Sequence, residues 1–249
     1  MDQRLPHPPS GRRFERLLER EGELAAVEGL EAEAAAGDGR LLVVEGPAGI
    51  GKTRLVVEAR RRAEAAGFEV RTARGAELER DFPFGVVRQL FEPVLADPDA
   101  AARLLQGSAA AARPVLAPLD PGGEVPADAS FAALHGLYWL CVNLSGEAPL
   151  MLAVDDLHWC ARPSLRFLAY LVRRQEGLPL LVTASLRPAE PGADAALLAE
   201  LVGDPMAVRL QPAPLSPGAT GQLIGARLGA EPEGDFAAIC HRATGGNPL

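Results

Sequence analysis

Residues 41–53 constrain the fold of this chain more than any other stretch. They begin with a short apolar run, residues 41–44, which has the length and β-branched content of a buried strand. A glycine-rich segment follows and ends in Gly51-Lys52-Thr53, completing the pattern of a glycine, four residues and Gly-Lys-Thr. Residues 55–63 then place apolar side chains at helical spacing. A strand, a glycine-rich loop and a helix in this order are typical of a phosphate-binding loop.

The residue types in the loop suit a nucleotide with its divalent ion. Glycines allow successive backbone N–H groups to point at one anion, and the helix that follows adds the positive end of its dipole. Lys52, the only lysine in the chain, can reach the β- and γ-phosphates, and the Thr53 hydroxyl can bind Mg²⁺. We therefore expect ATP or ADP and Mg²⁺ to be held by the loop residues Gly46, Pro47, Ala48, Gly49, Ile50, Gly51, Lys52 and Thr53.

Charge and cysteine usage exclude several other classes of protein. The chain has 249 residues and a formal net charge of −8, which argues against a broad basic surface for DNA. Cys141, Cys160 and Cys240 are odd in number and widely spaced, as in a cytoplasmic protein with reduced thiols. The pair His158-x-Cys160 lacks the spacing of a zinc site. No apolar run approaches the length that spans a membrane, so we expect no membrane partner.

Four more segments have the pattern of strands. Residues 68–72 alternate, whereas 150–154 and 178–185 are nearly continuous apolar runs, as in parallel strands buried on both faces. A further, shorter strand is predicted over residues 207–210. Helical patterns lie between them, notably 13–36, 81–95, 130–144 and 164–174. The alternation predicts an α/β fold, a three-layer α/β/α P-loop nucleotidase with a mostly parallel five-stranded sheet.

Two segments between the strands are less strongly patterned. Residues 97–129 are rich in proline, glycine and alanine, which predicts a small helix followed by a loop over 114–128. Tyr138 and Trp139 fall in the helical segment 130–144, and we expect both side chains in the core.

Proline positions divide the chain into three parts. Residues 1–12 are expected to form a flexible lead-in, and residues 13–212 the P-loop ATPase core. Pro212, Pro214 and Pro217 mark the end of that core. Residues 213–249 then carry two short helical patterns and are expected to be the beginning of a helical lid domain that is truncated at residue 249.

Adjacent carboxylates, Asp155 and Asp156, follow the buried run at 150–154. Charges at the end of a buried strand are costly unless they are paired or bound to a metal. In nucleotidases with a phosphate-binding loop, a carboxylate at this place holds Mg²⁺ directly or through water. We assign Asp155 to Mg²⁺ together with Thr53. Asp156 would orient or deprotonate the attacking water.

An arginine follows the next strand at the same edge of the predicted sheet. Open α/β sheets bind their ligands at the carboxyl ends of the strands, where Arg187 is expected. A guanidinium at that edge can contact the γ-phosphate and would lose this contact when the phosphate is released, so its position would depend on which nucleotide is bound. The predicted catalytic residues are therefore Lys52, Asp156 and Arg187.

Five motifs across nearly the whole chain carry a resemblance to a known family. They are Leu-Leu-Glu-Arg-Glu-Gly-Glu-Leu at 17–24, the loop at 46–53, Leu-Met-Leu-Ala-Val-Asp-Asp-Leu-His-Trp at 150–159, Ala-Ser-Leu-Arg-Pro at 184–188 and Gly-Gly-Asn-Pro-Leu at 245–249. The sequence resembles the AAA ATPase-like module of the STAND class, and more narrowly the large ATP-binding LuxR-type transcriptional regulators of bacteria. Asp-Asp-Leu-His-Trp and Gly-Gly-Asn-Pro-Leu are the most discriminating of these motifs.

This resemblance implies further roles. Leu18, Arg20 and Glu21 match a motif that packs near adenine and ribose, with a glycine usual where Glu19 stands. Pro248 resembles a lid proline that contacts adenine in the closed, ADP-bound form. The family uses slow ATP hydrolysis as a switch: ADP holds a closed monomer, and an inducer with ATP opens it for self-association. The inducer or a regulatory protein would bind a downstream region, and DNA a C-terminal helix-turn-helix domain. Both lie outside these residues.

Three other functions share the phosphate-binding loop. A small-molecule kinase would need an acceptor pocket and a mobile lid carrying an arginine, whereas adjacent Asp155 and Asp156 favour activation of water. An oligomeric AAA machine or replication initiator would need an arginine finger for a neighbouring subunit, for which Arg162 is the candidate. A binding module without turnover is disfavoured by the retention of Lys52, Thr53 and both carboxylates.

Overall fold

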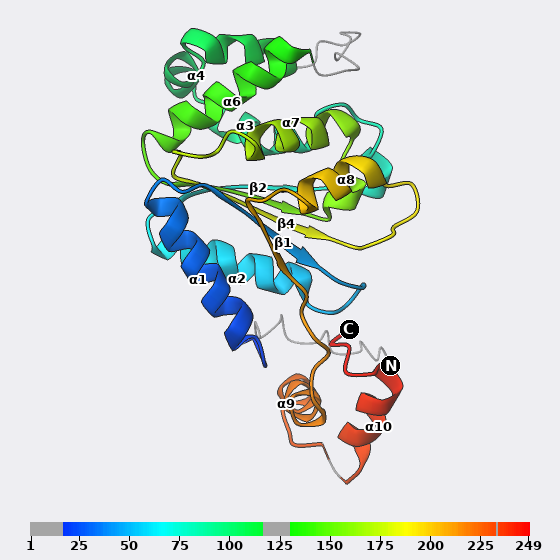
Figure 1. The fold of residues 1–249 in the computed structure, drawn as a ribbon. Coiled ribbons are helices and arrows are strands. Elements are labelled where there is room, and N and C mark those ends of the chain that lie inside the picture. The colour runs from blue at the N-terminus through cyan, green and yellow to red at the C-terminus, as the bar shows by residue number, and fades with distance from the viewer. Residues whose placement is uncertain (1–16, 117–129, 233) are drawn as a thin grey trace, which may run out of the picture. The chain divides into compact units, whose positions relative to one another are not determined.

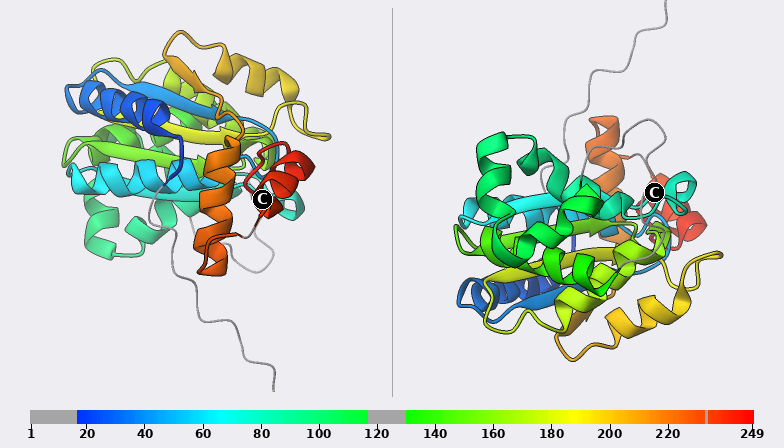
Figure 2. Two further views of the ribbon diagram at one scale, coloured as in Figure 1. Left: turned by 90° about the horizontal axis from the view of Figure 1, so that it is seen from below. Right: turned by 90° about the horizontal axis from the view of Figure 1, so that it is seen from above.

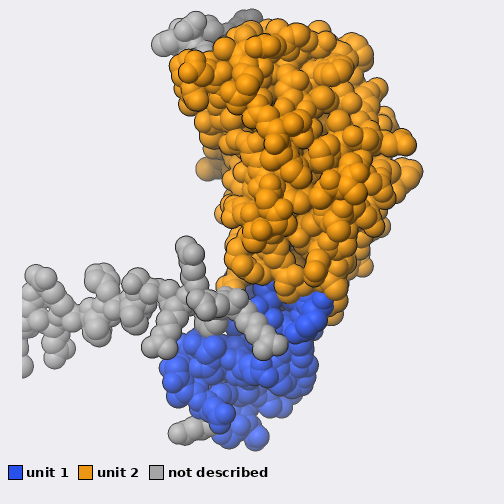
Figure 3. Space-filling model, turned by 90° about the vertical axis from the view of Figure 1, so that its left-hand side faces the viewer, with its two compact units in different colours: residues 1–21, 214–249 blue, residues 22–213 orange. Residues whose placement is uncertain are grey.

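The structure is a computed structural model that describes residues 17–116, 130–232 and 234–249. It divides into two compact units, coloured separately in Figure 3. Unit 1 comprises residues 1–21 and 214–249, and unit 2 comprises residues 22–213. The predicted lead-in at 1–12 lies outside the described residues.

Unit 2 is built on a five-stranded sheet in which every pair of neighbouring strands is parallel. The strand order is β2-β3-β4-β1-β5. The strands are β1 (Arg40–Glu45), β2 (Glu69–Arg74), β3 (Leu150–Asp155), β4 (Leu180–Leu186) and β5 (Ala207–Leu210). Each lies within two residues of the segment predicted from its apolar pattern, so the predicted α/β fold class is confirmed.

The strand register aligns the carboxyl ends of the central strands. Val44 of β1 pairs with Ser185 of β4, and Val154 of β3 pairs with Ala184 of β4. All residues of β3 except Asp155 are buried, and all of β4 are buried, because helices cover both faces of these strands. Residues that follow β1, β3 and β4 therefore emerge side by side at one edge.

Helices cover both faces of the sheet (Figures 1 and 2). On one face lie α1 (Glu21–Ala35) and α2 (Lys52–Ala65), and on the other α3 (Gly85–Leu95), α7 (Arg162–Val172) and α8 (Ala195–Val202). Phe91 of α3 meets Phe167 of α7 edge to face, with ring centroids 6.0 Å apart. Outside this layer lie α4 (Pro98–Leu104) and α6 (Phe131–Ser145). Among the described residues, no helix has the length and apolar character to cross a membrane.

The alanine-rich stretch after α4 is more helical than its composition predicted. A 3₁₀ helix, Gly107–Ala112, leads directly into α5 (Arg113–Leu116). The prediction of a loop beginning at 114 is therefore wrong for residues 114–116, since a proline is tolerated in the first turn of a helix; residues 117–128 lie outside the described part. Gly136 lets α6 approach this segment closely, because a Cβ there would lie 2.4 Å from the Ala112 nitrogen.

Of the two aromatic side chains on α6 predicted to lie in the core, Tyr138 packs against it, whereas the prediction is wrong for Trp139. Tyr138 is only half-buried and Trp139 remains 37% exposed. Helix α6 contains no charged residue, so its sequence gives little contrast between the inward and outward faces.

Unit 1 contains α9 (Pro217–Leu228) and α10 (Phe236–Thr244), with the short segment that precedes α1. The Ser216 Oγ caps α9 by accepting a hydrogen bond from the Ala219 N–H, and the Glu19 carboxylate accepts from the Ser216 N–H at 2.8 Å. Glu19 has a φ of 53°, so the described chain turns here and the helix predicted from residue 13 begins at Glu21.

A buried carboxyl on α1 makes the stability of the fold dependent on pH. Burial raises the pKa of Glu31 to about 7, and its Oε1 has no hydrogen-bond partner among the described residues. Because the pKa is raised in the folded state, its stabilising contribution is complete below the unfolded value and is lost as pH rises through about 7. Relative to Glu31→Gln, the wild type should lose on the order of 1–3 kcal/mol of unfolding free energy between about pH 5 and pH 8.

Urea denaturation of both proteins across this pH range measures the difference. Glu64→Gln, an exposed change on α2, is the control and should follow the wild-type curve. Parallel curves for the wild type and Glu31→Gln would contradict the burial argument.

Candidate functional site

The segment between β1 and α2 has the curled backbone of an anion-binding loop. Gly49 and Gly51 have φ values of 80° and 104°, which side chains with a Cβ rarely adopt. A Cβ on Gly46 would lie 3.0 Å from the Ile50 Cγ2 atom, so the loop also closes tightly on itself. Helix α2 begins at Lys52 and turns its amino-terminal end towards the loop.

Lys52 folds its side chain back over this loop. Its Nζ donates hydrogen bonds to the carbonyl oxygens of Gly46 at 2.9 Å and Pro47 at 2.8 Å. Burial lowers the pKa of the ammonium group, and the nearby charge of Arg187 lowers it further. A phosphate bound in the loop would oppose both effects, so the site favours an anion.

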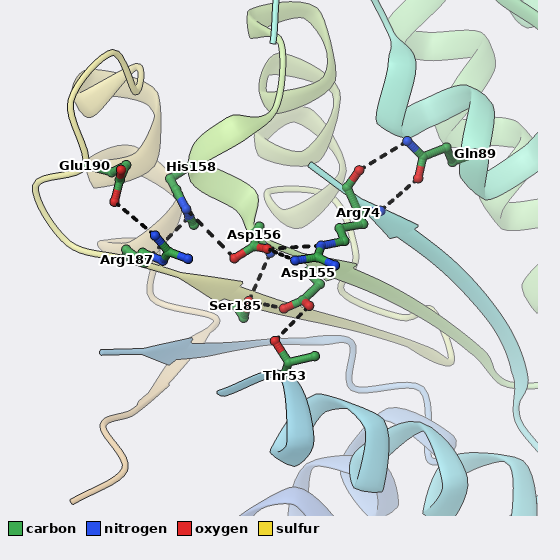
Figure 4. A network of polar contacts seen from close by, with 9 residues as sticks. All are labelled: Thr53, Arg74, Gln89, Asp155, Asp156, His158, Ser185, Arg187 and Glu190. Atoms are coloured by element: carbon green, nitrogen blue, oxygen red, sulfur yellow. Dashed lines mark hydrogen bonds and ion pairs between the residues drawn. The ribbon is translucent and has the colours of Figure 1, made fainter. Parts of the chain in front are cut away.

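Three oxygen-bearing side chains converge next to the loop (Figure 4). The Thr53 hydroxyl donates to Asp155 Oδ2 at 2.9 Å, and the Ser185 hydroxyl donates to Asp155 Oδ1. Ser185 also accepts from the Asp156 N–H at 3.0 Å. The predicted pair, Thr53 and Asp155, is thus brought together by the ends of α2 and β3.

The donor set fits Mg²⁺ held jointly by protein and nucleotide. Thr53 and Asp155 supply hydroxyl and carboxylate oxygens, the ligands that Mg²⁺ prefers. Within the described ranges, no group of three or more His, Cys, Asp or Glu side chains could hold a metal ion by itself. Mg²⁺ commonly takes one or two protein ligands and completes its shell with phosphate oxygens and water.

Asp156 lies beside this group in a constrained position. Its φ of 54° places it in the left-handed region, and its Oδ2 accepts hydrogen bonds from the Arg74 guanidinium at 2.9 and 3.1 Å. Gly75 leaves room for the Asp156 backbone in this conformation, because a Cβ on residue 75 would lie only 2.4 Å from the Asp156 carbonyl oxygen. Gln89 of α3 fixes the Arg74 backbone by accepting from its N–H at 2.8 Å and donating to its carbonyl at 3.1 Å.

His158 connects Asp156 to the residue that follows β4. The Arg187 N–H donates to His158 Nδ1 at 3.2 Å, which leaves the hydrogen of the neutral ring on Nε2. Burial is the main cause that lowers the pKa of His158, with a smaller contribution from Arg187. The Nε2 atom lies 3.9 Å from Asp156 Oδ1 and has no hydrogen-bond partner among the described residues.

Arg187 itself lies at the carboxyl edge, as predicted. Its guanidinium is 3.8 Å from the Glu190 carboxylate, and its charge acts on Lys52. The predicted residues Lys52, Thr53, Asp155, Asp156 and Arg187 therefore all belong to one edge of unit 2.

The other predicted binding residues belong to unit 1. They are Leu18, Arg20 and Pro248. Arg20 is buried and donates to the Glu19 carbonyl at 2.8 Å. The positive φ of Glu19 matches the glycine that the family resemblance places there.

Sequence reasoning assigned no role to Arg74, Gln89, His158 or Ser185. Ser185 is the one with a readable signal, since it is a polar residue at the end of an apolar strand beside the loop strand. Arg74 is the last residue of the edge strand β2. Arginine is so frequent in this chain that one more arginine at a strand end did not indicate a functional residue.

A comparison with protein families identifies this architecture. Residues 16–183, more than half of the chain, match the profile described as AAA ATPase domain. This range includes the loop and both carboxylates, and ends two residues before Ser185. No curated protein matches the sequence significantly.

Several solved structures share the fold at low sequence identity. A Walker-type ATPase of Pyrococcus abyssi has a TM-score of 0.55 at 15% identity, over 95% of this chain and 66% of that one. The ORC1 protein of Aeropyrum pernix, solved with DNA, has 0.52 at 19%, over 92% and 56%. A Pyrococcus horikoshii signal transduction ATPase with numerous domains, which has a tetratricopeptide repeat sensor, gives 0.54 at 18%, over 95% and 29%. This chain thus spans less than two thirds of each relative.

Removal of the loop lysine should abolish nucleotide binding. In Lys52→Ala, the only ammonium group positioned over the loop is lost, so ATP affinity should fall at least a hundredfold, about 2.7 kcal/mol. Isothermal titration calorimetry with ATP and Mg²⁺ measures this. ATP affinity equal to that of the wild type would contradict the assignment of the loop.

Ser185→Ala should selectively weaken binding that depends on Mg²⁺. It removes a hydrogen bond to a charged carboxylate, a contact worth about 1.5–3 kcal/mol, and leaves Asp155 less well oriented. We expect about a tenfold loss of ATP affinity with Mg²⁺ and little change in EDTA. Ser185→Thr, which keeps the hydroxyl, is the control; equal losses in both conditions would show that Ser185 does not act through the metal ligand.

Proposed function

Since the chain belongs to the AAA ATPase domain family, we propose that it is an ATP-dependent conformational switch of a signal-responsive transcriptional regulator. It binds ATP with Mg²⁺ and hydrolyses the nucleotide slowly. The observation that carries the proposal is the 2.9 Å contact of Thr53 with Asp155 beside the loop that Lys52 covers. This arrangement supports an anionic phosphate chain and its divalent ion at one edge of the sheet.

Each residue at the edge has a separate role in this proposal. Lys52 leaves the loop carbonyls and binds the β- and γ-phosphates, and the loop amides and the α2 amino terminus bind the same charge. Thr53 and Asp155 hold Mg²⁺, which neutralises developing negative charge when it is bound. Arg187 contacts the γ-phosphate, and this contact is lost when hydrolysis releases that phosphate.

Asp156 orients or deprotonates the attacking water. In the described arrangement its Oδ2 is occupied by Arg74, and its Oδ1 faces the His158 Nε2 atom at 3.9 Å. A base held by an arginine is poorly placed to take a proton, which agrees with slow turnover. Movement of Asp156 away from Arg74 towards the γ-phosphate would complete the site.

The regulatory part of the proposal rests on unit 1. The segment with Leu18 and Arg20 and the C-terminal motif with Pro248 fall in this same compact unit. Glu19 accepts hydrogen bonds from Ser216, and the neighbouring Leu215 N–H donates to the Gly246 carbonyl at 2.8 Å, so both segments are tied to the chain before α9. This supports the proposal that the two motifs act as one lid body, as expected for a LuxR-type STAND regulator whose sensor and DNA-binding regions lie elsewhere in the full protein.

An oligomeric initiator-type ATPase is the second candidate. The Arg162 side chain, at the start of α7, is 73% exposed and lies 3.6 Å from the Asp194 carboxylate. Its exposure suits an arginine finger offered to a neighbouring subunit. Sedimentation with ATP separates the candidates: a stable ring whose turnover requires Arg162 favours the initiator-type machine.

Asp156→Asn should retain ATP binding and slow hydrolysis on the order of 10²–10⁴-fold, because the amide cannot accept the proton of the attacking water. Calorimetry measures binding, and release of inorganic phosphate measures turnover. Arg74→Gln is the matched variant on the opposite side of the ion pair. It releases Asp156 and should hydrolyse ATP at least as fast as the wild type.

Wild-type turnover in Asp156→Asn would exclude Asp156 as the base. A phosphorylated small molecule in place of free phosphate would favour a kinase.

A further inference from the structure

Charge is unevenly distributed along this acidic chain. The chain has a net charge of −8, yet residues 157–175 contain four arginines and no acidic residue. Helix α7 lies within this basic stretch. Helix α6, which packs against α7, has no charged residue at all. The two helices therefore form a local basic and uncharged surface on an otherwise acidic protein.

Aromatic residues form a row on the outward face of α6. Phe131, His135 and Trp139 are spaced four residues apart, so they lie on one side of the helix. Phe131 is 70% exposed and its ring is stacked on His135, with 10° between the planes. The Trp139 Nε1 atom donates to His135 Nε2 at 3.0 Å. Each ring is thus held in place while part of its surface faces solvent.

The aromatic row continues onto α7. The Tyr170 hydroxyl lies 3.2 Å from His135 Nδ1, and its ring meets that of Phe131 edge to face. The Arg174 guanidinium lies 3.8 Å from the centre of the Tyr170 ring and donates to the Tyr170 carbonyl. The cation is therefore positioned over an aromatic base before any partner binds.

A groove of about 390 Å³ lies beside this cluster. Leu134, Ala169 and Leu197 supply apolar lining, and Arg166, Arg173 and Arg174 supply positive charge. Glu200 also lines the groove, where its carboxylate pairs with Arg173 at 2.9 Å. We call this region, with Phe131 and Tyr170, the α6–α7 surface.

We propose that the α6–α7 surface binds an acidic segment of a partner protein that inserts an aromatic or aliphatic side chain into the groove. Exposed, preorganised aromatic residues with arginine are the typical composition of binding hot spots. The groove accepts the apolar anchor, and the arginines attract carboxylates at its rim. This surface is separate from the loop and carboxylates at 46–53 and 155–156, so the proposal does not depend on nucleotide hydrolysis.

A protein partner fits better than a nucleic acid. Two of the arginines in the basic stretch are already close to carboxylates, Arg173 to Glu200 and Arg162 to Asp194. The aromatic helix α6 adds no positive charge. Phosphate backbones require several basic contacts to overcome their own repulsion from an acidic protein, whereas one buried anchor and one or two carboxylates suffice here.

The test is a phage-display experiment in which random peptides are selected for binding to the full chain. Phage that also bind the Arg174→Glu variant are removed, so that the remaining peptides depend on this surface. Selected peptides should be enriched in Asp and Glu around a Trp, Phe or Leu. A fluorescein-labelled selected peptide should then bind the wild type saturably in anisotropy titrations. Phe131→Ser and Arg174→Glu, both changes at exposed residues, should each weaken binding at least tenfold.

Arg61→Glu is the matched control. It reverses an arginine that is 66% exposed on α2, on the other face of the sheet, and should bind the peptide as the wild type does. All variants should keep wild-type thermal stability and ATP turnover. The proposal is overturned if no acidic anchored peptide is selected, or if the surface variants bind it unchanged. It is also overturned if a labelled single-stranded oligonucleotide, or a second copy of the chain, binds this surface in preference.

Discussion

The contact on which the site depends is the hydrogen bond from the Thr53 hydroxyl to the Asp155 carboxylate. It joins residues 102 positions apart in the sequence, one at the start of α2 and the other at the end of β3. These elements meet although β1 and β3 are not neighbours, because β4 lies between them with its carboxyl end at the same level. Without the parallel sheet, the loop that we propose binds phosphate and the carboxylate that we propose binds Mg²⁺ would not lie at one site.

The strand between them is also a functional part of the site. Ser185 of β4 donates a hydrogen bond to Asp155 and accepts one from the Asp156 N–H. Arg187, the residue after β4, donates its backbone N–H to His158. Ser185, Asp156 and His158 are buried, so the bonds they make offset a desolvation cost that would otherwise destabilise the fold. Removal of one member therefore alters the position of the others. The edge is better understood as one connected network than as separate catalytic residues.

Particular residues show where sequence reasoning succeeded and failed. Strands β3 and β4 were predicted because parallel strands buried on both faces need continuous apolar runs, whereas the edge strand β2 was predicted from its alternating pattern. The outward position of Trp139 was not predicted, since α6 lacks the charges that distinguish two faces of a helix. The helix predicted from residue 13 begins only at Glu21, because the described backbone turns at Glu19 by adopting a conformation usual for glycine.

The sequence by itself determined the local chemistry: a phosphate-binding loop after an apolar strand, a single lysine, and two carboxylates and an arginine at strand ends. Such features depend on the spacing of residues close together in the chain, which can be read from the sequence without knowing the fold. Only the tertiary structure decided that Arg74 pairs with Asp156 and that Tyr170 of α7 meets His135 and Phe131 of α6. These contacts join residues far apart in the sequence, so they depend on strand order and helix packing, which local spacing does not reveal.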